Sequence, residues 1–358
     1  MSRLRRWAKR LGAGKARRRL RTALWLRGLA TEWQYRLRRP AVKRRLQQAA
    51  EVPRGLHLEA TNICNARCIF CAYPQMERPK VSMDMDLFQR VLDQYEAMGG
   101  RHVSLTPIVG DPFVDRLLFE RLDVLAARLS IQSFYFFTNA ILMTPETVER
   151  LLSYGSRLRI CVSMGGFDRE TYDRLMGVDR FAKVWGHLRE YVERSRAYAD
   201  RPRLEIHLRC AETDCRGEAW LELKGWEKEG LAQIFAIETY DSWAGKIDAH
   251  DLEKHGLRAT RQVHRRGACE LLYMKPVVLA DGRVNACACR DVEAELIVGD
   301  LEQNSLGEIF DGEPLQDLRR RHEAGDYPEV CRRCTYYVSV YDPLMGQVSK
   351  DALNWRDG

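Results

Sequence analysis

Three cysteines, Cys64, Cys68 and Cys71, are separated by three and then two residues within one short stretch. Thiolates are soft ligands that suit zinc, copper(I) or an iron–sulfur cluster. A structural zinc site uses four ligands, usually in two pairs, whereas this stretch offers three and no nearby histidine. A cubane cluster takes four thiolates, so three would leave one iron open, as a reactive site requires. Zinc completed by a distant fourth ligand is the alternative interpretation.

With Phe70 just before the third cysteine, the stretch resembles the Cys-x3-Cys-x-aromatic-Cys signature of radical SAM enzymes. The resemblance implies that the three cysteines hold a [4Fe–4S] cluster whose open iron is chelated by S-adenosylmethionine (SAM). It further implies reductive cleavage of SAM to a 5′-deoxyadenosyl radical, which abstracts hydrogen from a substrate. In that family the fold is a partial (βα)6 barrel, which we expect here over residues 51–258.

Strand and helix patterns alternate from residue 51, which predicts a parallel sheet with helical crossovers and an α/β fold class. Strands are expected at 55–61, 102–108, 132–138, 158–164, 204–209 and 232–238. Helices are expected at 84–98, 115–129, 144–154, 181–198 and 217–230. Ligands of such sheets bind beyond the carboxyl ends of the strands, and the three cysteines follow the first strand.

Residues at the later strand ends resemble the weaker family motifs, and the resemblance implies that they contact SAM. The residues concerned are Gly110, Asp111, Asn139, Ser163 and Arg209, and Phe70 within the cysteine signature is a further expected cofactor-binding residue. Asp111 stands where the family often has the longer Glu, which shortens its reach by one methylene. Arg209 could pair with the SAM carboxylate through a charge-assisted bond. Each of these motifs is also ordinary turn material when taken alone.

A second group of cysteines lies in residues 259–358, around a hairpin signal at Asp281-Gly282. It resembles the SPASM or twitch module, a small α+β cysteine-rich unit. The resemblance implies four ligands for one auxiliary [4Fe–4S] cluster: Cys269, Cys287, Cys331 and Cys334. Cys289 is a spare or a substitute for Cys287, and a structural zinc is the alternative occupant. Three further cysteines, Cys161, Cys210 and Cys215, have no ligand spacing and are interpreted as structural.

Residues 1–50 contain seventeen Lys or Arg and one acid, while the whole chain carries +8, so the remaining residues are net acidic. Tryptophans and leucines recur among the arginines at helical intervals, which predicts a basic amphipathic helical arm. Such an arm suits contact with an anionic membrane surface. A solvated helix against the acidic body is the alternative. Nucleic acid is disfavoured, because few aromatics are interleaved as stacking platforms.

The chain has eleven cysteines and neither a secretory signal nor an apolar run long enough to span a membrane. We therefore expect a cytoplasmic protein, peripheral at the membrane if the arm binds there. The expected function is hydrogen abstraction from a small molecule or peptide, leading to oxidation or another modification of a peptide, sugar or lipid-linked metabolite. An electron donor such as flavodoxin or ferredoxin is implied. The alternatives are a radical SAM enzyme acting on RNA and a zinc protein that binds nucleic acid without catalysis.

Overall fold

The computed structural model describes residues 33, 36, 37, 39–42 and 55–341, except 107, 238, 261, 262, 264, 275 and 276. The chain divides into two units, one of Met1–Gln48 with Val340–Gly358 and one of Ala49–Ser339. The described residues between 33 and 42 are helical. The remainder of the predicted basic arm over 1–50 lies outside the described residues.

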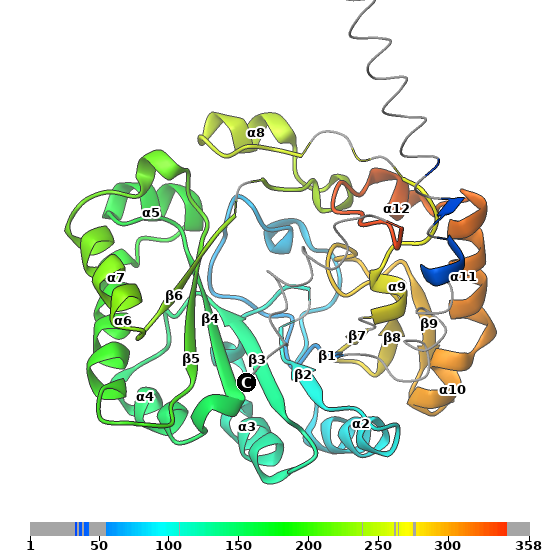
Figure 1. Ribbon diagram of the computed structural model, residues 1–358, viewed down its shortest axis with the longest axis horizontal. Helices are drawn as coiled ribbons and strands as arrows, with labels where there is room; N and C mark the ends of the chain where they lie inside the picture. The colour runs from blue at the N-terminus through cyan, green and yellow to red at the C-terminus, as the bar shows by residue number, and fades with distance from the viewer. Residues whose placement is uncertain are drawn as a thin grey trace, which may run out of the picture. The chain divides into compact units, whose positions relative to one another are not determined.

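Six parallel strands form the first part of the larger unit, which confirms the predicted sheet (Figure 1). They are β1 (Leu56–Leu58), β2 (His102–Ser104), β3 (Ser133–Thr138), β4 (Leu158–Met164), β5 (Arg203–Leu208) and β6 (Gln233–Ala236). They pair in chain order, each with the next. The curved, partial barrel of the expected kind therefore begins at β1, the strand that leads to the first cysteines.

Helices between the strands lie along the outer side of this sheet (Figure 1). They are α2 (Met85–Ala97), α3 (Leu118–Ala127), α4 (Pro145–Leu152), α5 (Arg169–Met176), α6 (Phe181–Ser195) and α7 (Glu218–Lys228). In α2, Asp84 accepts a hydrogen bond from the N–H of Leu87 at 2.6 Å and caps the first turn. The buried stripe of α2, which includes Phe88 and Tyr95, packs into the core.

Alternation along β4 and β5 separates an apolar face from a polar one. Leu158, Ile160 and Val162 are fully buried on one face of β4. The other face carries polar side chains at every second position: Arg159, Cys161 and Ser163 on β4, then Glu205, His207 and Arg209 on and just after β5. The helices cover the apolar face, so the polar side chains line the inner side of the barrel.

A C-terminal module continues the same sheet on the other side of β1. Its strands are β7 (Val277–Val278), β8 (Arg283–Asn285) and β9 (Ile297–Asp300), and β7 pairs in parallel with β1. The β7–β8 and β8–β9 pairs are antiparallel. Its helices are α9 (Leu271–Met274), α10 (Leu306–Asp311), α11 (Glu313–Ala324) and α12 (Glu329–Arg333), and α8 (Ala249–Lys254) precedes the module.

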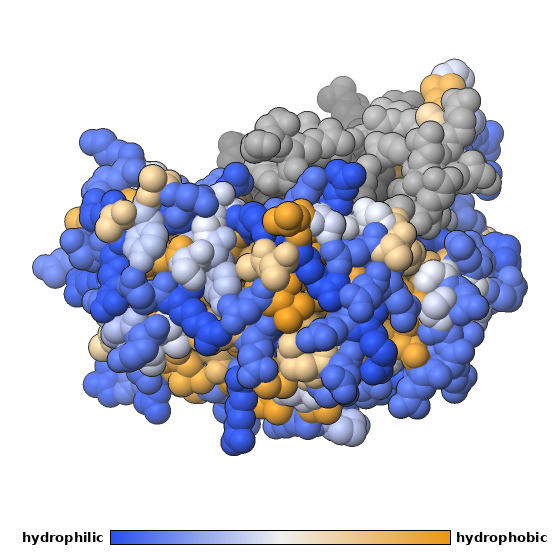
Figure 2. All heavy atoms as spheres, turned by 90° about the horizontal axis from the view of Figure 1, so that it is seen from below, coloured by the Kyte–Doolittle hydropathy of each residue, from blue (hydrophilic) through white to orange (hydrophobic). Residues whose placement is uncertain are grey.

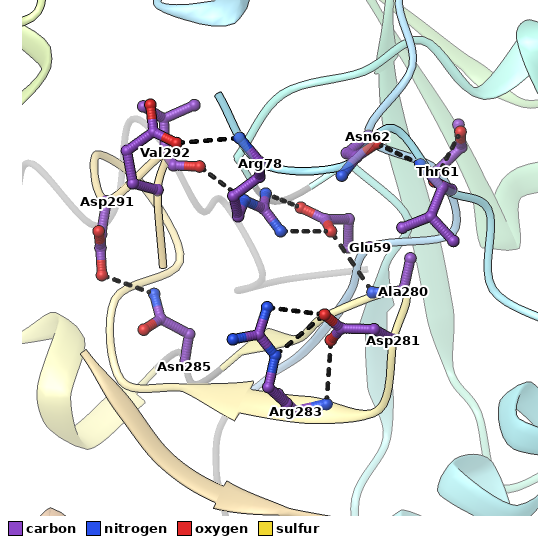
Figure 3. Close-up of polar contacts among 12 residues, drawn as sticks. Glu59, Thr61, Asn62, Arg78, Ala280, Asp281, Arg283, Asn285, Asp291 and Val292 are labelled. Atoms are coloured by element: carbon purple, nitrogen blue, oxygen red, sulfur yellow. Dashed lines mark hydrogen bonds and ion pairs between the residues drawn. The ribbon is translucent and has the colours of Figure 1, made fainter. Parts of the chain in front are cut away.

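A buried ion pair joins the barrel to this module. Arg78 makes two hydrogen bonds to the carboxylate of Glu59, at 2.6 and 3.0 Å, and both side chains are almost fully buried. Arg78 also donates from Nε to the carbonyl of Val292 at 2.7 Å. On the other side, the N–H of Ala280 points to Glu59 at 3.4 Å (Figure 3). Residues of the barrel and of the module therefore share one polar network.

Hydrophilic residues cover most of the face shown in Figure 2, with hydrophobic residues exposed in patches between them. Within the part of the chain that the structure describes, no helix has the length and apolar character needed to cross a membrane.

Candidate active site

The first cysteine site lies on the loop after β1, beyond the carboxyl end of the strand. Burial raises the pKa of Cys64 to about 12 and raises that of Cys68 and Cys71 as well. Negative charge at Cys71 and Cys64 raises the pKa of Cys68 further. Thiols in such surroundings become thiolates when a metal ion or cluster compensates their charge. That these three cysteines hold one cluster stays a prediction.

The end of α5 holds the cysteine loop in place. The N–H of Arg67 donates to the carbonyl of Met176 at 3.1 Å, and the N–H of Ile69 donates to that of Leu175 at 3.1 Å. Gly177 follows with φ +68°, and a Cβ there would stand 2.4 Å from the carbonyl oxygen of Arg67. Only glycine allows this approach without a clash. A helix for which the sequence analysis gave no expectation therefore supports the cysteine loop.

Gly110 brings the turn after β2 against the same loop. Its φ is +110°, and a Cβ at this position would lie 2.3 Å from the carbonyl oxygen of Thr61. The next residue, Asp111, donates its N–H to the carbonyl of Ile63 at 2.9 Å. The predicted site residue Gly110 thus serves close backbone packing beside the cysteines.

Asp111 connects the turn after β2 to the turn after β3. Its Oδ2 accepts hydrogen bonds from the N–H of Asn139 at 2.7 Å and from the hydroxyl of Thr138 at 2.9 Å. Its Oδ1 accepts from the N–H of Phe113 at 3.1 Å, and the side chain is buried. With three donors already bound, the carboxylate organises these turns. A direct contact of Asp111 with SAM stays a prediction.

Asn139 in turn reaches the cysteine loop. Its Nδ2 donates to Oδ1 of Asn65 at 2.6 Å and lies 3.8 Å from Sγ of Cys64. The following residue, Ala140, has φ +58°, in the left-handed region that favours glycine. The turns after β1, β2 and β3 therefore form one connected set around Cys64.

Arg209 and Phe70 meet on another side of the cysteines. The guanidinium of Arg209 lies 5.9 Å from the ring centre of Phe70, and its Nε approaches Oγ of Ser163 at 3.4 Å. Among the described residues, no carboxylate forms a salt bridge with Arg209. Burial lowers the pKa of this guanidinium, since it disfavours the charged form. The predicted SAM-site residues Phe70 and Ser163 thus lie beside Arg209, whose guanidinium can bind an anionic group.

Tyr240 lies beside Phe70 as well. Its ring packs 5.6 Å from that of Phe70, and the side chain is buried. Its hydroxyl has no hydrogen-bond partner among the described residues. A buried hydroxyl of this kind usually has a partner, and a ligand beside Phe70 and Arg209 would supply one. The orphaned hydroxyl and the unpaired guanidinium both fit a polar ligand such as SAM.

A polar cluster lies on the inner face of the barrel, where Cys161 is the register partner of Glu205 and Ser163 that of His207. Ligand atoms of Cys161, Glu205 and His207 lie within 4.8 Å of one another, and all three residues are buried. Arg159 also pairs with Glu205 at 3.3 Å. Because that cation already balances the carboxylate, we interpret the cluster as a hydrogen-bonded polar wall. The every-second-residue polarity of β4 and β5 was the sequence signal for it.

The second cysteine site is a single pocket in the C-terminal module. Four cysteines line it together with Arg290, Asp291, His322 and Tyr336: Cys269, Cys287, Cys331 and Cys334. Cys289 is not among the lining residues, so the geometry favours Cys287 as the fourth ligand. Burial raises the pKa of all four thiols, that of Cys269 to about 12. Four converging buried thiols fit one tetrahedral metal or one cubane cluster.

Arginine and asparagine side chains fix the backbone of this pocket. Arg265 donates from Nε to the carbonyl of Cys331 at 3.0 Å and also bonds the carbonyl of Cys334. Asn285 donates to the carbonyl of Cys287 at 3.0 Å. These bonds place the loop after β8 and the end of α12 so that their cysteines face one cavity.

A parallel barrel with three cysteines at its strand ends and a second four-cysteine pocket defines a protein with two thiolate sites for metal ions or iron–sulfur clusters. The family profile of the radical SAM superfamily matches residues 58–201. That of SPASM, an iron–sulfur cluster-binding domain, matches residues 269–335. The chain belongs to the radical SAM superfamily and carries a C-terminal SPASM domain. Its cofactors are accordingly SAM with a [4Fe–4S] cluster and an auxiliary iron–sulfur cluster.

Solved structures share this fold at low sequence identity. BtrN in complex with AdoMet and 2-DOIA is 15% identical, with a TM-score of 0.52 over 79% of this chain and 93% of that one. Streptococcus suis SuiB bound to precursor peptide SuiA is 16% identical, with a TM-score of 0.55 over 78% and 69%. The enzyme anSMEcpe with AdoMet and the Cp18Cys peptide is 15% identical, with a TM-score of 0.52 over 76% and 84%.

A curated relative, the GTP 3′,8-cyclase of Desulforamulus reducens, is 23% identical over 141 residues. The match covers 38% of this chain and 42% of that protein. The chain thus spans less than half the length of this relative, and the likeness supports the barrel rather than a shared substrate.

Proposed function

We propose that the protein is a radical SAM SPASM enzyme that abstracts hydrogen from a small polar molecule or a peptide. The single observation that carries the proposal is the position of Arg209 and Tyr240 beside Phe70 in the cysteine loop. Among the described residues, no carboxylate pairs with this guanidinium and the tyrosine hydroxyl has no hydrogen-bond partner. The thiols match one iron–sulfur cluster with an open position, and the polar groups match the amino-acid part of SAM.

Cys64, Cys68 and Cys71 would hold the cluster, and the pocket of Cys269, Cys287, Cys331 and Cys334 would hold the auxiliary one. When bound, the cluster and SAM supply one-electron cleavage and a 5′-deoxyadenosyl radical. Arg209 would bind the SAM carboxylate, with Tyr240 donating or accepting one further hydrogen bond. Positioning would be the main contribution of the protein, since the cofactor carries the chemistry.

The inner face of the barrel supports a polar substrate. Arg159, Glu205 and His207 present charged and hydrogen-bonding groups below the SAM site. The ring of His207 stacks on Phe235 at 4.9 Å, which fixes its orientation. A substrate with hydroxyl, amine or amide groups would find partners there, as a sugar or a peptide does. The named structural relatives were solved with a peptide or with 2-DOIA.

Release of 5′-deoxyadenosine tests the chemistry. Protein with reconstituted clusters, incubated without oxygen with SAM and dithionite, should form 5′-deoxyadenosine. The Cys68→Ala variant should form none, because the first cluster loses a ligand. Cys215→Ala is the matched control, since Cys215 belongs to neither cysteine site, and it should retain the activity. Cluster-loaded protein that neither binds nor cleaves SAM would overturn the proposal.

The assignments outside the two sites are part of the same proposal. We infer a barrel domain over 51–258, a SPASM module over 259–358 and a basic arm over 1–50. We further propose a cytoplasmic enzyme that is reduced by flavodoxin or ferredoxin, with the arm contacting an anionic membrane. Liposome flotation of chains with and without residues 1–50 tests the arm, and equal flotation of both would exclude it as the anchor.

A further inference from the structure

One short segment, Asp241–Gly245, contacts the loops of both cysteine sites. The indole Nε1 of Trp243 donates to the carbonyl of Phe70 at 2.8 Å, inside the first cysteine loop. Ser242 donates its N–H to Oγ1 of Thr335 at 2.7 Å, next to Cys334 of the second site. The segment therefore links two loops that are more than 250 residues apart in the chain.

An ion pair is fixed on this segment. Arg290 donates from Nε to Oδ2 of Asp241 at 2.7 Å. Its guanidinium lies between two rings, 4.4 Å from the centre of Trp243 and 4.2 Å from that of Tyr336. The N–H of Trp243 donates a hydrogen bond to Oδ1 of Asp241 at 2.9 Å. Both charges are thus held in one geometry by stacking and by hydrogen bonds.

The backbone of the segment is strained where it carries the pair. Trp243, Ala244 and Gly245 have consecutive φ values of +46°, +54° and +91°. Left-handed conformations at a tryptophan and an alanine cost free energy, and they persist only where the surroundings hold them. The hydrogen bonds to Phe70 and Thr335 keep the segment in this conformation.

The pair lies within electrostatic reach of a ligand from each site. Tyr336, which stacks on Arg290, donates its N–H to Sγ of Cys334 at 3.3 Å. Burial is the largest cause of the raised pKa of Cys71 and Cys334. In addition, Arg290 lowers and Asp241 raises the pKa of both thiols. The same two charges therefore act on both cysteine groups.

We propose that the Asp241–Arg290 ion pair is a shared electrostatic control that sets the reduction potentials of the SAM-binding cluster and the auxiliary cluster together. The inference rests on the proposed function, since it requires both clusters. Potentials of iron–sulfur clusters depend on nearby charge and hydrogen bonds. Because the pair is neutral as a whole, its removal matters little, whereas removal of one member leaves an uncompensated charge near both clusters. Both are positioning residues, since neither is a ligand.

Two single substitutions test this with opposite signs. Asp241→Asn leaves the Arg290 cation uncompensated, which favours the reduced clusters and should raise both potentials. Arg290→Gln leaves the Asp241 carboxylate and should lower both. We expect a change of about tenfold in each one-electron equilibrium, which is ~59 mV. The readout is a potentiometric titration of holoenzyme, in which electron paramagnetic resonance follows both clusters.

Three controls separate charge from folding. The double variant Asp241→Asn/Arg290→Gln is neutral and should have both potentials near wild type, as should Arg290→Lys, which keeps the cation. Asp123→Asn removes one member of an exposed pair with Arg150 on the outer helices and should move neither potential. Asp241→Asn is isosteric and keeps an acceptor for the N–H of Trp243, so the test does not depend on the folding of Arg290→Gln.

The outcomes distinguish the two proposals. Wild-type protein that lacks two reducible clusters, or does not cleave SAM, would refute the proposed function. If both clusters load and SAM is cleaved, but Asp241→Asn leaves either potential unchanged or moves the two in opposite directions, the shared control is refuted and the enzyme assignment stands.

Discussion

The N–H of Asn139 donates a hydrogen bond of 2.7 Å to the buried carboxylate of Asp111. This bond ties the turn after β3 to the turn after β2, and the side chain of Asn139 extends the connection to Asn65 between the first cysteines. The position of Cys64 therefore depends on residues from three strand ends rather than on the cysteine loop alone.

Loss of the Asp111 carboxylate should loosen this set of turns. Asp111→Ala leaves three donors without an acceptor, and each costs about 1–3 kcal/mol when buried. Asp111→Asn should be milder, because its remaining oxygen still accepts. We expect both variants to unfold at lower temperature and to bind SAM more weakly, in the order Ala, Asn, wild type. Calorimetry of the cluster-loaded proteins measures both quantities, and an alanine variant as stable as wild type would contradict the organising role.

Gly110→Ala should damage the first site through the backbone alone. The new Cβ would meet the carbonyl oxygen of Thr61 at 2.3 Å, at a φ that side chains rarely adopt. We expect a loss of roughly 2 kcal/mol or more in the free energy of unfolding, with a lower iron content. Gly186→Ala in α6 is the matched control, because nothing lies within 4 Å of its Cβ position. That change should stabilise the helix by about 0.5–1 kcal/mol.

Arg209→Met should weaken SAM binding while both clusters remain loaded. A charge-assisted hydrogen bond contributes about 1.5–3 kcal/mol, so the Kd for SAM should rise at least ~10-fold. Arg216→Met, which removes an exposed guanidinium a few residues further on, should leave the Kd unchanged. Equilibrium dialysis under anaerobic conditions gives the comparison. Equal affinity of the Arg209 variant and wild type would remove Arg209 from the site.

Cys287 and Cys289 make a matched pair for the auxiliary site. Only Cys287 lines the pocket with the other three thiols. Cys287→Ser should therefore lose about four irons per chain, whereas Cys289→Ser should keep them. Iron analysis with Mössbauer spectra of the reconstituted proteins decides between them, and the reverse result would assign Cys289 as the ligand.

Acid should destabilise the barrel partly through His207. Burial lowers the pKa of this imidazole, so the folded protein holds it neutral while the unfolded chain can protonate it. The contribution of His207 to the free energy of unfolding is complete above the ordinary histidine pKa and is lost as the pH falls below that value. The loss is about 1.4 kcal/mol for each unit by which the folded pKa lies below the unfolded one. His207→Phe should show a smaller fall in apparent Tm between pH 7 and pH 5 than wild type. Parallel pH profiles would show that other groups carry the acid sensitivity.

Local patterns predicted the parts of the molecule that depend on nearby residues. Ligand spacing indicated the cysteine loop, and the strand–helix alternation indicated the parallel sheet. The short helix α5 escaped prediction because polar and charged residues dominate Arg169–Met176. Its role in supporting the cysteine loop depends on the contact of Gly177 with Arg67. These residues are too far apart in the sequence for a local pattern to reveal it.

Side-chain partners across the fold were likewise beyond reach. Arg290 and Asp241 are 49 residues apart, and their meeting depends on how the module folds against the barrel. Cys287 and Cys289 are both polarisable residues after one strand, and only the direction of each side chain distinguishes them.

The continuous sheet limits how this protein can be cut or recombined. His57 and Leu58 of β1 have Val277 and Val278 of β7 as their register partners, so a chain ending near residue 258 would leave β1 as an open edge. Such edges invite aggregation, and the carboxylate of Glu59 would lose its cover as well. A chimera that exchanges the C-terminal half for another would need a donor carrying its own replacement for β7 and for the carbonyl that receives Arg78. The barrel and the C-terminal module must therefore be exchanged or expressed together, and an isolated barrel would be unsuitable for studying SAM chemistry.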